Sequence, residues 1–305
     1  MEIGKTAQHN GLNSTDSGAS VPGRPLSAVE GGGKKSHATE HSSRSGLVGE
    51  SASTGTLGKA MDVLNIVANA SRPPRFTEIL QQSDQPRGTL HRQLTNLVAE
   101  GLLNQRADQA YELGYTLLRF AARAWAGNEF RSVAHPHLKS LHEMTGETVH
   151  LAVLRQNEVV YLDKVEGTQS VRMHSQIGNA SPAYCTGVGK AALSVLNERQ
   201  LEDYIRSVSF HRYTESTIAD AADLRSRLAQ VREAGFAFDD EEHETGIHCV
   251  SSPVYSADLS LIAAISVTGP VYRITRSQLE TWAETVRTTA YQIMEDMQAR
   301  LGPRA

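Results

Sequence analysis

The chain has 305 residues, of which 39% are hydrophobic and 21% charged, and its formal net charge is -4. This length favours two domains, and the charge balance means that any nucleic-acid-binding surface must be local. Two cysteines outside any CxxC spacing exclude a disulfide framework and a zinc finger. Because there is neither a long apolar span nor a signal peptide, we expect a cytoplasmic protein that does not enter a membrane.

Residues 1–53 are dominated by Gly, Ser, Thr and Ala, with almost no apolar periodicity. Such a segment cannot bury enough surface to offset its ordering entropy, so we expect a disordered tail. A basic arm that follows DNA is the alternative. Lysine and arginine are matched about one for one by acidic residues here, which favours a solvated tail.

Residues 54–114 carry the pattern of a winged helix-turn-helix. Apolar residues at helical spacing predict a first helix that ends near Ser71, and a short second helix follows over residues 76–82. Pro86 suits the first position of a third helix, and Gly101 ends that helix. The third helix turns leucines inward and polar side chains outward, which is typical of a helix that reads DNA.

Two short strands, at 102–105 and 110–113, predict the hairpin that forms the wing. Arginine and amide side chains on the third helix can bind phosphates or base edges, with further contacts from the flanking helices and the wing. A helix-turn-helix that contacts only protein is the alternative. The candidate DNA-binding residues are Lys59, Arg75, Arg87, Thr89, His91, Arg92, Gln93, Asn96 and Arg106.

Residues 115–130 predict a linker helix with an unusually apolar surface, which includes Leu118, Phe120 and Trp125. Apolar patches of this size are rarely left in water. We therefore expect the linker to pack on a partner subunit in a homodimer or homotetramer, and packing on the chain's own second domain is the alternative.

Residues 131–305 predict a mixed domain, which makes the whole chain α+β. His135 and His137 bracket Pro136 and are expected at a helix start, not as metal ligands. The alternating pattern that begins after Glu147 predicts the first strands of a sheet. The expected strands cover residues 148–154, 158–166, 247–255 and 261–268, and the expected helices cover residues 187–196, 198–207, 221–235 and 279–301.

Small residues from Thr186 to Lys190 stand at a predicted helix start. Free backbone N–H groups and the positive end of the helix dipole favour an anion there, so a small carboxylate is the expected ligand. The segment is not a phosphate-binding P-loop, because Tyr184 stands where that motif needs glycine. Tight packing of the helix on the sheet is the alternative reason for the glycines.

Cys249 follows an acidic run at 239–242, which raises the possibilities of a cysteine nucleophile and of a metal held by the carboxylates and His243. On a strand, the adjacent His248 would point away from Cys249 and could not activate it. Consecutive acids are more often a solvated face. We therefore expect no enzyme, no metal and no cofactor.

Over about residues 54–302 the chain resembles the IclR family of bacterial transcription regulators. The resemblance implies a winged helix head, a dimerising linker helix and a GAF-like, profilin-like effector-binding domain that often pairs dimers into tetramers. The matching stretches are LGKAMDVLNIVA, TLHRQLTNLVAEGLL, TGETVHLAVL, VVYLDKVEG, VRMHSQIG, TGVGKAAL, FDDEEHETGIHCVSSPV and AISVTGP.

The resemblance also implies a function, which is sequence-specific binding to a double-stranded DNA operator, modulated by a small organic acid or aromatic metabolite. We expect a repressor, and a sensor whose head contacts protein is the alternative. Two positions depart from the family pattern: Ser181 stands where a hydrophobic residue is common, and Gly88 replaces the usual serine. The effector-binding positions implied by the match are Met173, Ser181, Gly187, Val188, Asp239, Cys249, Ser266 and Thr268.

Overall fold

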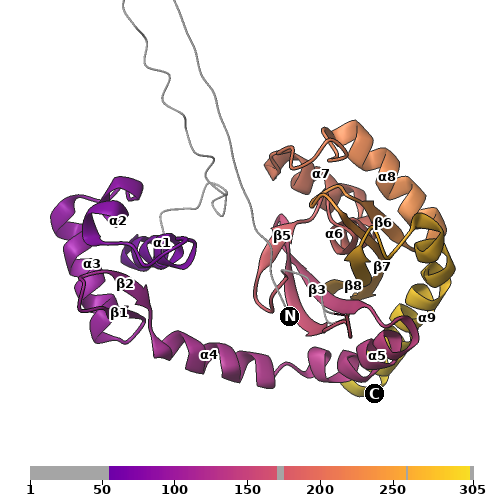
Figure 1. The fold of residues 1–305 in the computed structure, drawn as a ribbon, viewed down its shortest axis with the longest axis horizontal. Helices are drawn as coiled ribbons and strands as arrows, with labels where there is room; N and C mark the ends of the chain where they lie inside the picture. Colours follow the sequence, from indigo (N-terminus) through magenta and orange to yellow (C-terminus); the bar gives the residue numbers. More distant parts are fainter. Residues whose placement is uncertain (1–54, 170–174, 259, 303–305) are drawn as a thin grey trace, which may run out of the picture. The chain divides into compact units, whose positions relative to one another are not determined.

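The computed structural model describes residues 55–169, 175–258 and 260–302. The expected tail over residues 1–53 and the candidate Met173 lie outside the described residues. Within these ranges, no helix combines the length and the apolar character needed to cross a membrane. The elements form a helical head with a small hairpin, a connecting helix and a larger domain built on one sheet, which confirms the α+β class (Figure 1).

The head has the order predicted for a winged helix-turn-helix. Buried apolar side chains from all three helices and from the hairpin form one core, with Ile79 and Leu90 fully buried. Glu78 accepts a hydrogen bond from the Arg75 backbone N–H at 2.8 Å and so caps the second helix. The elements are α1 (Gly55–Ala68), α2 (Phe76–Gln82), α3 (Arg87–Ala99), β1 (Leu103–Gln105) and β2 (Tyr111–Leu113).

The connecting helix α4 (Tyr115–Ala126) has no buried residue. It ends before Gly127, and the Asn128 side chain caps α5 (Glu129–Thr145) by accepting from the Arg131 N–H at 2.8 Å. The linker predicted over residues 115–130 is therefore shorter than expected, because Asn128 starts a new helix inside that range.

The prediction of a helix start at Pro136 is wrong. Pro136 lies inside α5, where it removes one backbone hydrogen bond, but the helix continues because its inner face is buried, with Leu138 and Leu141 at 0% exposure. The flanking histidines make side-chain contacts: His135 with Asp163, and His137 with Asp296.

The second domain is a six-stranded antiparallel sheet in the order β5-β4-β3-β8-β7-β6. One apolar core joins the sheet to α5 and α9, and another joins its opposite face to α6, α7 and α8. The elements are β3 (Thr148–Arg155), β4 (Glu158–Val165), β5 (Ala180–Pro182), α6 (Gly187–Ser194), α7 (Glu198–Ser207), α8 (Ala221–Ala234), β6 (Ala237–Asp240), β7 (Ile247–Ser256), β8 (Leu261–Pro270) and α9 (Arg276–Leu301).

Sequence patterns predicted the long strands but missed β5 and β6, the two edges of the sheet. Strand β5 has only three residues, and β6 ends in two aspartates, a residue type depleted in strands. The interpretation of the acidic run as a solvated face is wrong, because Asp239 and Glu242 are 7% and 6% exposed. Both carboxylates have partners in the interior, described below, that permit this burial.

Helix α6 lies unusually close to the segment that precedes it. A Cβ on Gly189 would lie 2.1 Å from the Ala183 carbonyl oxygen and 2.4 Å from its Cα. These are backbone atoms, so the overlap cannot be relieved by a side-chain rotation. Glycine at this position therefore allows α6 to pack directly against the backbone of the segment that leads into it.

We expect Gly189→Ala to lower the stability of the protein by about 1–3 kcal/mol or more through overpacking, although alanine favours a helix by about 1 kcal/mol. Thermal unfolding followed by circular dichroism measures the change. Gly88→Ala is the matched control, because a Cβ there meets nothing within 4 Å. A melting temperature that does not fall in Gly189→Ala would contradict the packing argument.

Candidate functional site: an exposed helix face and a polar cavity

The outer face of α3 carries basic and polar side chains and no acidic one. Arg87 and Arg92 are exposed, and the Arg87 guanidinium lies 5.3 Å from the centre of the Phe76 ring, which also contacts His91. The face can therefore offer guanidinium groups to phosphates or guanine edges without local repulsion by carboxylates. Residues 55–114 as a whole contain six basic and six acidic side chains, so net charge does not mark this surface.

Eight of the nine candidate DNA-binding residues are exposed or half-buried, and Gln93 is the exception. Gln93 is 4% exposed, and its side-chain amide donates to the Thr56 backbone carbonyl at 3.3 Å. Its assignment to base recognition is therefore wrong, because the polar side chain joins α3 to the start of α1. The accessible candidates are Lys59, Arg75, Arg87, Thr89, His91, Arg92, Asn96 and Arg106.

The wing arginine is partly neutralised by its own hairpin. Arg106 lies 3.4 Å from a carboxylate oxygen of Asp108 and 3.6 Å from one of Glu112. All three side chains are about half exposed, so these pairs are weak and a phosphate can displace them. At the start of α3, Gly88 leaves space, since a Cβ there meets no atom within 4 Å.

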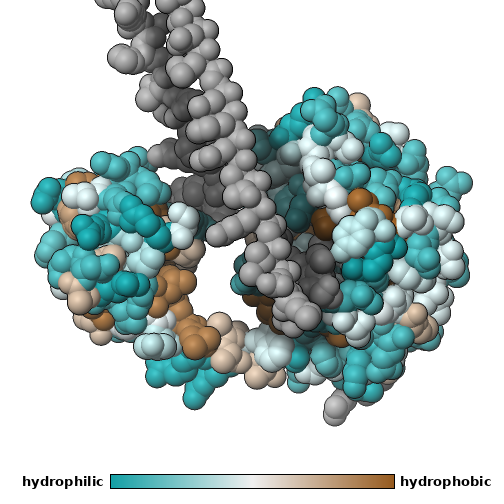
Figure 2. Space-filling model, in the orientation of Figure 1, coloured by the Kyte–Doolittle hydropathy of each residue, from teal (hydrophilic) through white to brown (hydrophobic). Residues whose placement is uncertain are grey.

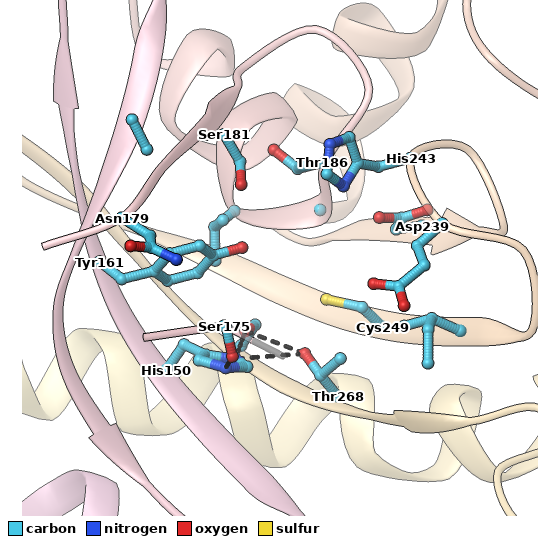
Figure 3. Close-up of a pocket in the computed structure, with 16 residues that line it drawn as sticks. His150, Tyr161, Ser175, Asn179, Ser181, Thr186, Asp239, His243, Cys249 and Thr268 are labelled. Carbon is cyan, nitrogen blue, oxygen red and sulfur yellow. Dashed lines mark hydrogen bonds between the residues drawn. The ribbon is translucent and has the colours of Figure 1, made fainter. Parts of the chain in front are cut away.

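A cavity of about 210 Å³ lies between the sheet and the start of α6 (Figure 3). Seven of the eight implied effector positions line it, while Met173 lies outside the described residues. The sequence analysis did not predict other wall residues, such as His150 and Tyr161. Each is flanked by apolar residues in its strand, so no cluster of polar residues along the chain marked it as part of a site. The seven are Ser181, Gly187, Val188, Asp239, Cys249, Ser266 and Thr268.

The floor of the cavity is a polar stripe across the central strands. Ser266 and Thr268 share one face of β8, as strand alternation predicts, and their hydroxyl oxygens lie 3.2 Å apart. His150 on β3 lies 3.2 Å from the Ser266 hydroxyl and 2.7 Å from that of Ser175. Burial lowers the pKa of His150 to about 3, so this imidazole is neutral and offers one donor and one acceptor.

One wall is the N-terminus of α6, which is held very close to β7. A Cβ on Gly187 would lie 2.6 Å from the Ser251 hydroxyl and 2.7 Å from the Cys249 thiol. The Thr186 hydroxyl caps the helix by accepting from the Gly189 N–H at 3.3 Å. The helix therefore presents its first backbone N–H groups beside the cavity, where they can stabilise an anion.

Asp239, on strand β6, also lies beside the N-terminus of α6. Burial raises its pKa to about 6, against the opposing effects of Lys190 and of the Glu242 and Gly187 backbone N–H groups. The Glu242 N–H lies 2.9 Å from the Asp239 carboxylate. The chain thus places its own carboxyl group at the helix end where an anionic effector would bind, and that group is mostly protonated only below about pH 6.

The loop after β6 is anchored by a buried ion pair. Lys190 on α6, 2% exposed, bonds to Glu242, and the Thr217 hydroxyl donates to the Glu242 carbonyl at 2.7 Å. Burial raises the pKa of Glu242 to about 7, with Lys190 opposing the shift. Since the same loop carries His243 and Glu244 into the cavity wall, the ion pair positions part of that wall (Figure 3).

In the described part of the chain, the side-chain hydrogen-bond partner of the Cys249 thiol is a hydroxyl and not a histidine. Its thiol lies 3.1 Å from the Ser251 hydroxyl, whereas the His248 ring bonds to the Ile274 carbonyl at 2.8 Å. Burial raises the pKa of Cys249 to about 11, so the thiolate that a nucleophile needs is disfavoured. Among the described residues, no group of three or more His, Cys, Asp or Glu side chains is placed to hold a metal ion.

Two family models match the chain in the order of its domains. One, described as the IclR helix-turn-helix domain, matches residues 56–107, and the other, described as the bacterial transcriptional regulator IclR C-terminal, matches residues 123–295. The acetate operon repressor of Salmonella typhimurium is 34% identical over 72% of this chain and 81% of its own length. The transcriptional repressor IclR of Escherichia coli is 31% identical over 78% of this chain and 88% of its own length.

Solved structures of similar proteins have the same fold. IclR of Thermotoga maritima is 30% identical with a TM-score of 0.61, and covers 81% of this chain and 99% of its own. An IclR homologue from Microbacterium hydrocarbonoxydans, complexed with 4-hydroxybenzoate, is 26% identical with a TM-score of 0.67, and covers 80% of this chain and all of its own. These relatives are regulators and not enzymes, and the chain belongs to the IclR family of bacterial transcriptional regulators.

Proposed function

We propose that the chain represses transcription in the cytoplasm by binding an operator through α3, and that a small carboxylate in the second domain changes its affinity for that operator. The observation that carries this proposal is the pairing of an acid-free, exposed recognition helix with a separate polar cavity at the N-terminus of α6. The names of the repressors that it resembles support the sign of regulation.

Two copies of the chain are expected to act together. Helix α4 buries none of its residues, and its exposed fractions include 80% for Tyr115, 66% for Leu118 and 55% for Phe120. Figure 2 shows this apolar surface in brown along the connecting helix. We propose that it packs on a second copy, which would set two α3 helices on half-sites about one DNA turn apart, or at a multiple of that spacing.

Sedimentation velocity of the purified chain tests the dimer, and a monomer at micromolar concentration would overturn it.

The effector is expected to be small and anionic with an aromatic or short organic body. The cavity of about 210 Å³ is below the range of about 300–1,000 Å³ that is typical of drug-sized ligands. The α6 backbone N–H groups suit a carboxylate, while Ser266, Thr268 and the neutral His150 suit a hydroxyl. A hydroxylated aromatic acid such as the 4-hydroxybenzoate found in the Microbacterium homologue combines both features.

For the DNA surface, Arg87→Ala/Arg92→Ala should weaken operator binding by about 2 kcal/mol or more, because each arginine contact to a guanine is worth about 1–3 kcal/mol. Genomic fragments selected by the wild-type chain, and then titrated by fluorescence anisotropy, provide the operator and the measurement. Arg199→Ala/Arg206→Ala on α7 removes the same charge away from the head and should bind normally. Normal operator binding by the α3 variant would exclude α3 as the reading helix.

For the cavity, Ser266→Ala should weaken 4-hydroxybenzoate binding about two- to tenfold, the loss expected for one neutral hydrogen bond of about 0.5–1.5 kcal/mol. Isothermal calorimetry measures the affinity, and the exposed Ser277→Ala on α9 is the control. If the wild-type chain does not bind 4-hydroxybenzoate, the aromatic class is wrong and other small carboxylates replace it in the titration. Unchanged affinity in Ser266→Ala would remove Ser266 from the site.

The effector should also bind more tightly at pH 5 than at pH 8. Asp239, with a pKa of about 6, is neutral below that value and charged above it, so it repels an anionic ligand only on the alkaline side. Calorimetry at the two pH values measures the ratio. Asp239→Asn should bind with an affinity that varies much less with pH, and a wild-type affinity that rises with pH would contradict the placement of the carboxylate beside Asp239.

A further inference from the structure

Strand β4 carries one extra residue, Leu162, within its pairing with β3. Ala152 pairs with Tyr161 and Leu151 pairs with Asp163, which leaves Leu162 with no partner in β3. An extra residue of this kind is a β-bulge, and it reverses the face to which the following side chains point. Tyr161 and Asp163 would share a face in a regular strand, and here they lie on opposite faces.

The two sides of this bulge belong to different parts of the domain. Tyr161 lines the cavity and packs with the core under α6, opposite Ala152. Asp163, opposite Leu151, is on the face covered by α5, where its carboxylate lies 2.8 Å from His135 and 3.2 Å from Arg131. One residue of β4 therefore separates a cavity wall from an ionic cluster on α5.

The bulge also contacts the end of α4, the helix that leads from the head. The Leu162 carbonyl accepts a hydrogen bond from the Trp125 indole N–H at 2.9 Å. The Arg131 guanidinium lies 3.5 Å from the centre of the Trp125 ring. The same arginine pairs with Asp163, so Trp125 contacts both the bulge carbonyl and an arginine that is paired with the residue after the bulge.

We infer that the Leu162 bulge couples the effector cavity to the linker helix, with Trp125 and Asp163 as the positioning residues of that coupling. The inference rests on the proposed effector-controlled operator binding and adds a route by which the two sites communicate. It assigns no effector contact to Trp125, whose role is confined to the position of α4.

The contacts of Tyr161 explain how a shift of its ring would reach the Leu162 bulge. Tyr161 is anchored to the segment before β5, since its N–H donates to the Asn179 carbonyl at 3.0 Å and its carbonyl accepts from the Gly178 N–H at 2.8 Å. Its ring lies 5.1 Å from that of His150 on the cavity floor. A ligand that displaces this ring moves β4 where the ladder to β3 is interrupted, and the Leu162 carbonyl moves with it. A ligand can shift operator affinity in this way only if it binds the two positions of β4 with different affinities.

The first experiment needs no effector. The chain has two tryptophans, so Trp282→Phe labelled with 5-fluorotryptophan gives a single fluorine resonance from Trp125. Adding Tyr161→Phe, which removes only the phenol hydroxyl, should shift that resonance by more than its linewidth. Adding Cys249→Ala, which changes the same cavity from β7, should leave it in place. A resonance that ignores Tyr161→Phe, or that responds equally to both changes, overturns the inference.

The second experiment measures coupling in the full chain. Trp125→Phe keeps an aromatic ring for Arg131 but removes the N–H that reaches Leu162. It should bind 4-hydroxybenzoate and the operator separately with wild-type affinities, while the factor by which 4-hydroxybenzoate changes operator affinity falls about fivefold, the effect of one hydrogen bond. Trp282→Phe is the matched control and should keep the full factor.

The outcomes separate the coupling from the function on which it rests. A wild-type factor in Trp125→Phe overturns the coupling and leaves the proposed function intact. No binding of 4-hydroxybenzoate to the wild-type chain refutes the aromatic effector, and the fluorine experiment then decides the coupling by itself.

Discussion

The close approach of α6 to the sheet is the constraint on which the second domain depends. Gly187 permits it, since a Cβ there would lie less than 3 Å from side chains of β7, and Gly189 allows α6 to pack against the Ala183 backbone just before the helix. This approach brings Lys190 and the helix N-terminus into the interior, and buried charges require partners. Glu242 pairs with Lys190, and Asp239 lies at the helix end. The cavity is the space left between this buried polar group and the sheet.

The two faces of the sheet have different surroundings. Its α6 face holds the polar cavity and the acidic loop, while its other face packs on α5 and α9 through an apolar core. Regular alternation keeps the side chains of each strand assigned to one face or the other, and the bulge at Leu162 is a local exception. At this bulge, β4 contributes Tyr161 to the cavity wall and offers the Leu162 carbonyl to Trp125 at the end of the linker helix, so one strand contacts both features.

Much of the architecture followed from periodicity. The long helix α9 could be predicted because its apolar residues recur at helical spacing, and β8, in which residues 263–270 are all buried, is a nearly continuous apolar run. Short edge strands lack both patterns, and β6 was not predicted because two of its four residues are aspartates. Gln93 shows the reverse error: a polar residue on a DNA-reading helix is expected outside, yet this one satisfies a backbone carbonyl of α1.

The sequence by itself determined the domain order, the family and the residue types available for a site. Segments as distant as Ser181 and Thr268 could be assigned to one cavity only through a family resemblance, because no local pattern relates them. Tertiary structure decided the rest. In the tertiary structure, two carboxylates of the acidic run are buried: Glu242 pairs with Lys190, and Asp239 lies at the N-terminus of α6. His150 and Tyr161 lie in the cavity wall, and Trp125 contacts the Leu162 carbonyl. The physical reason is that burial and pairing depend on which distant segments meet, whereas helix and strand periodicity depends on neighbours along the chain.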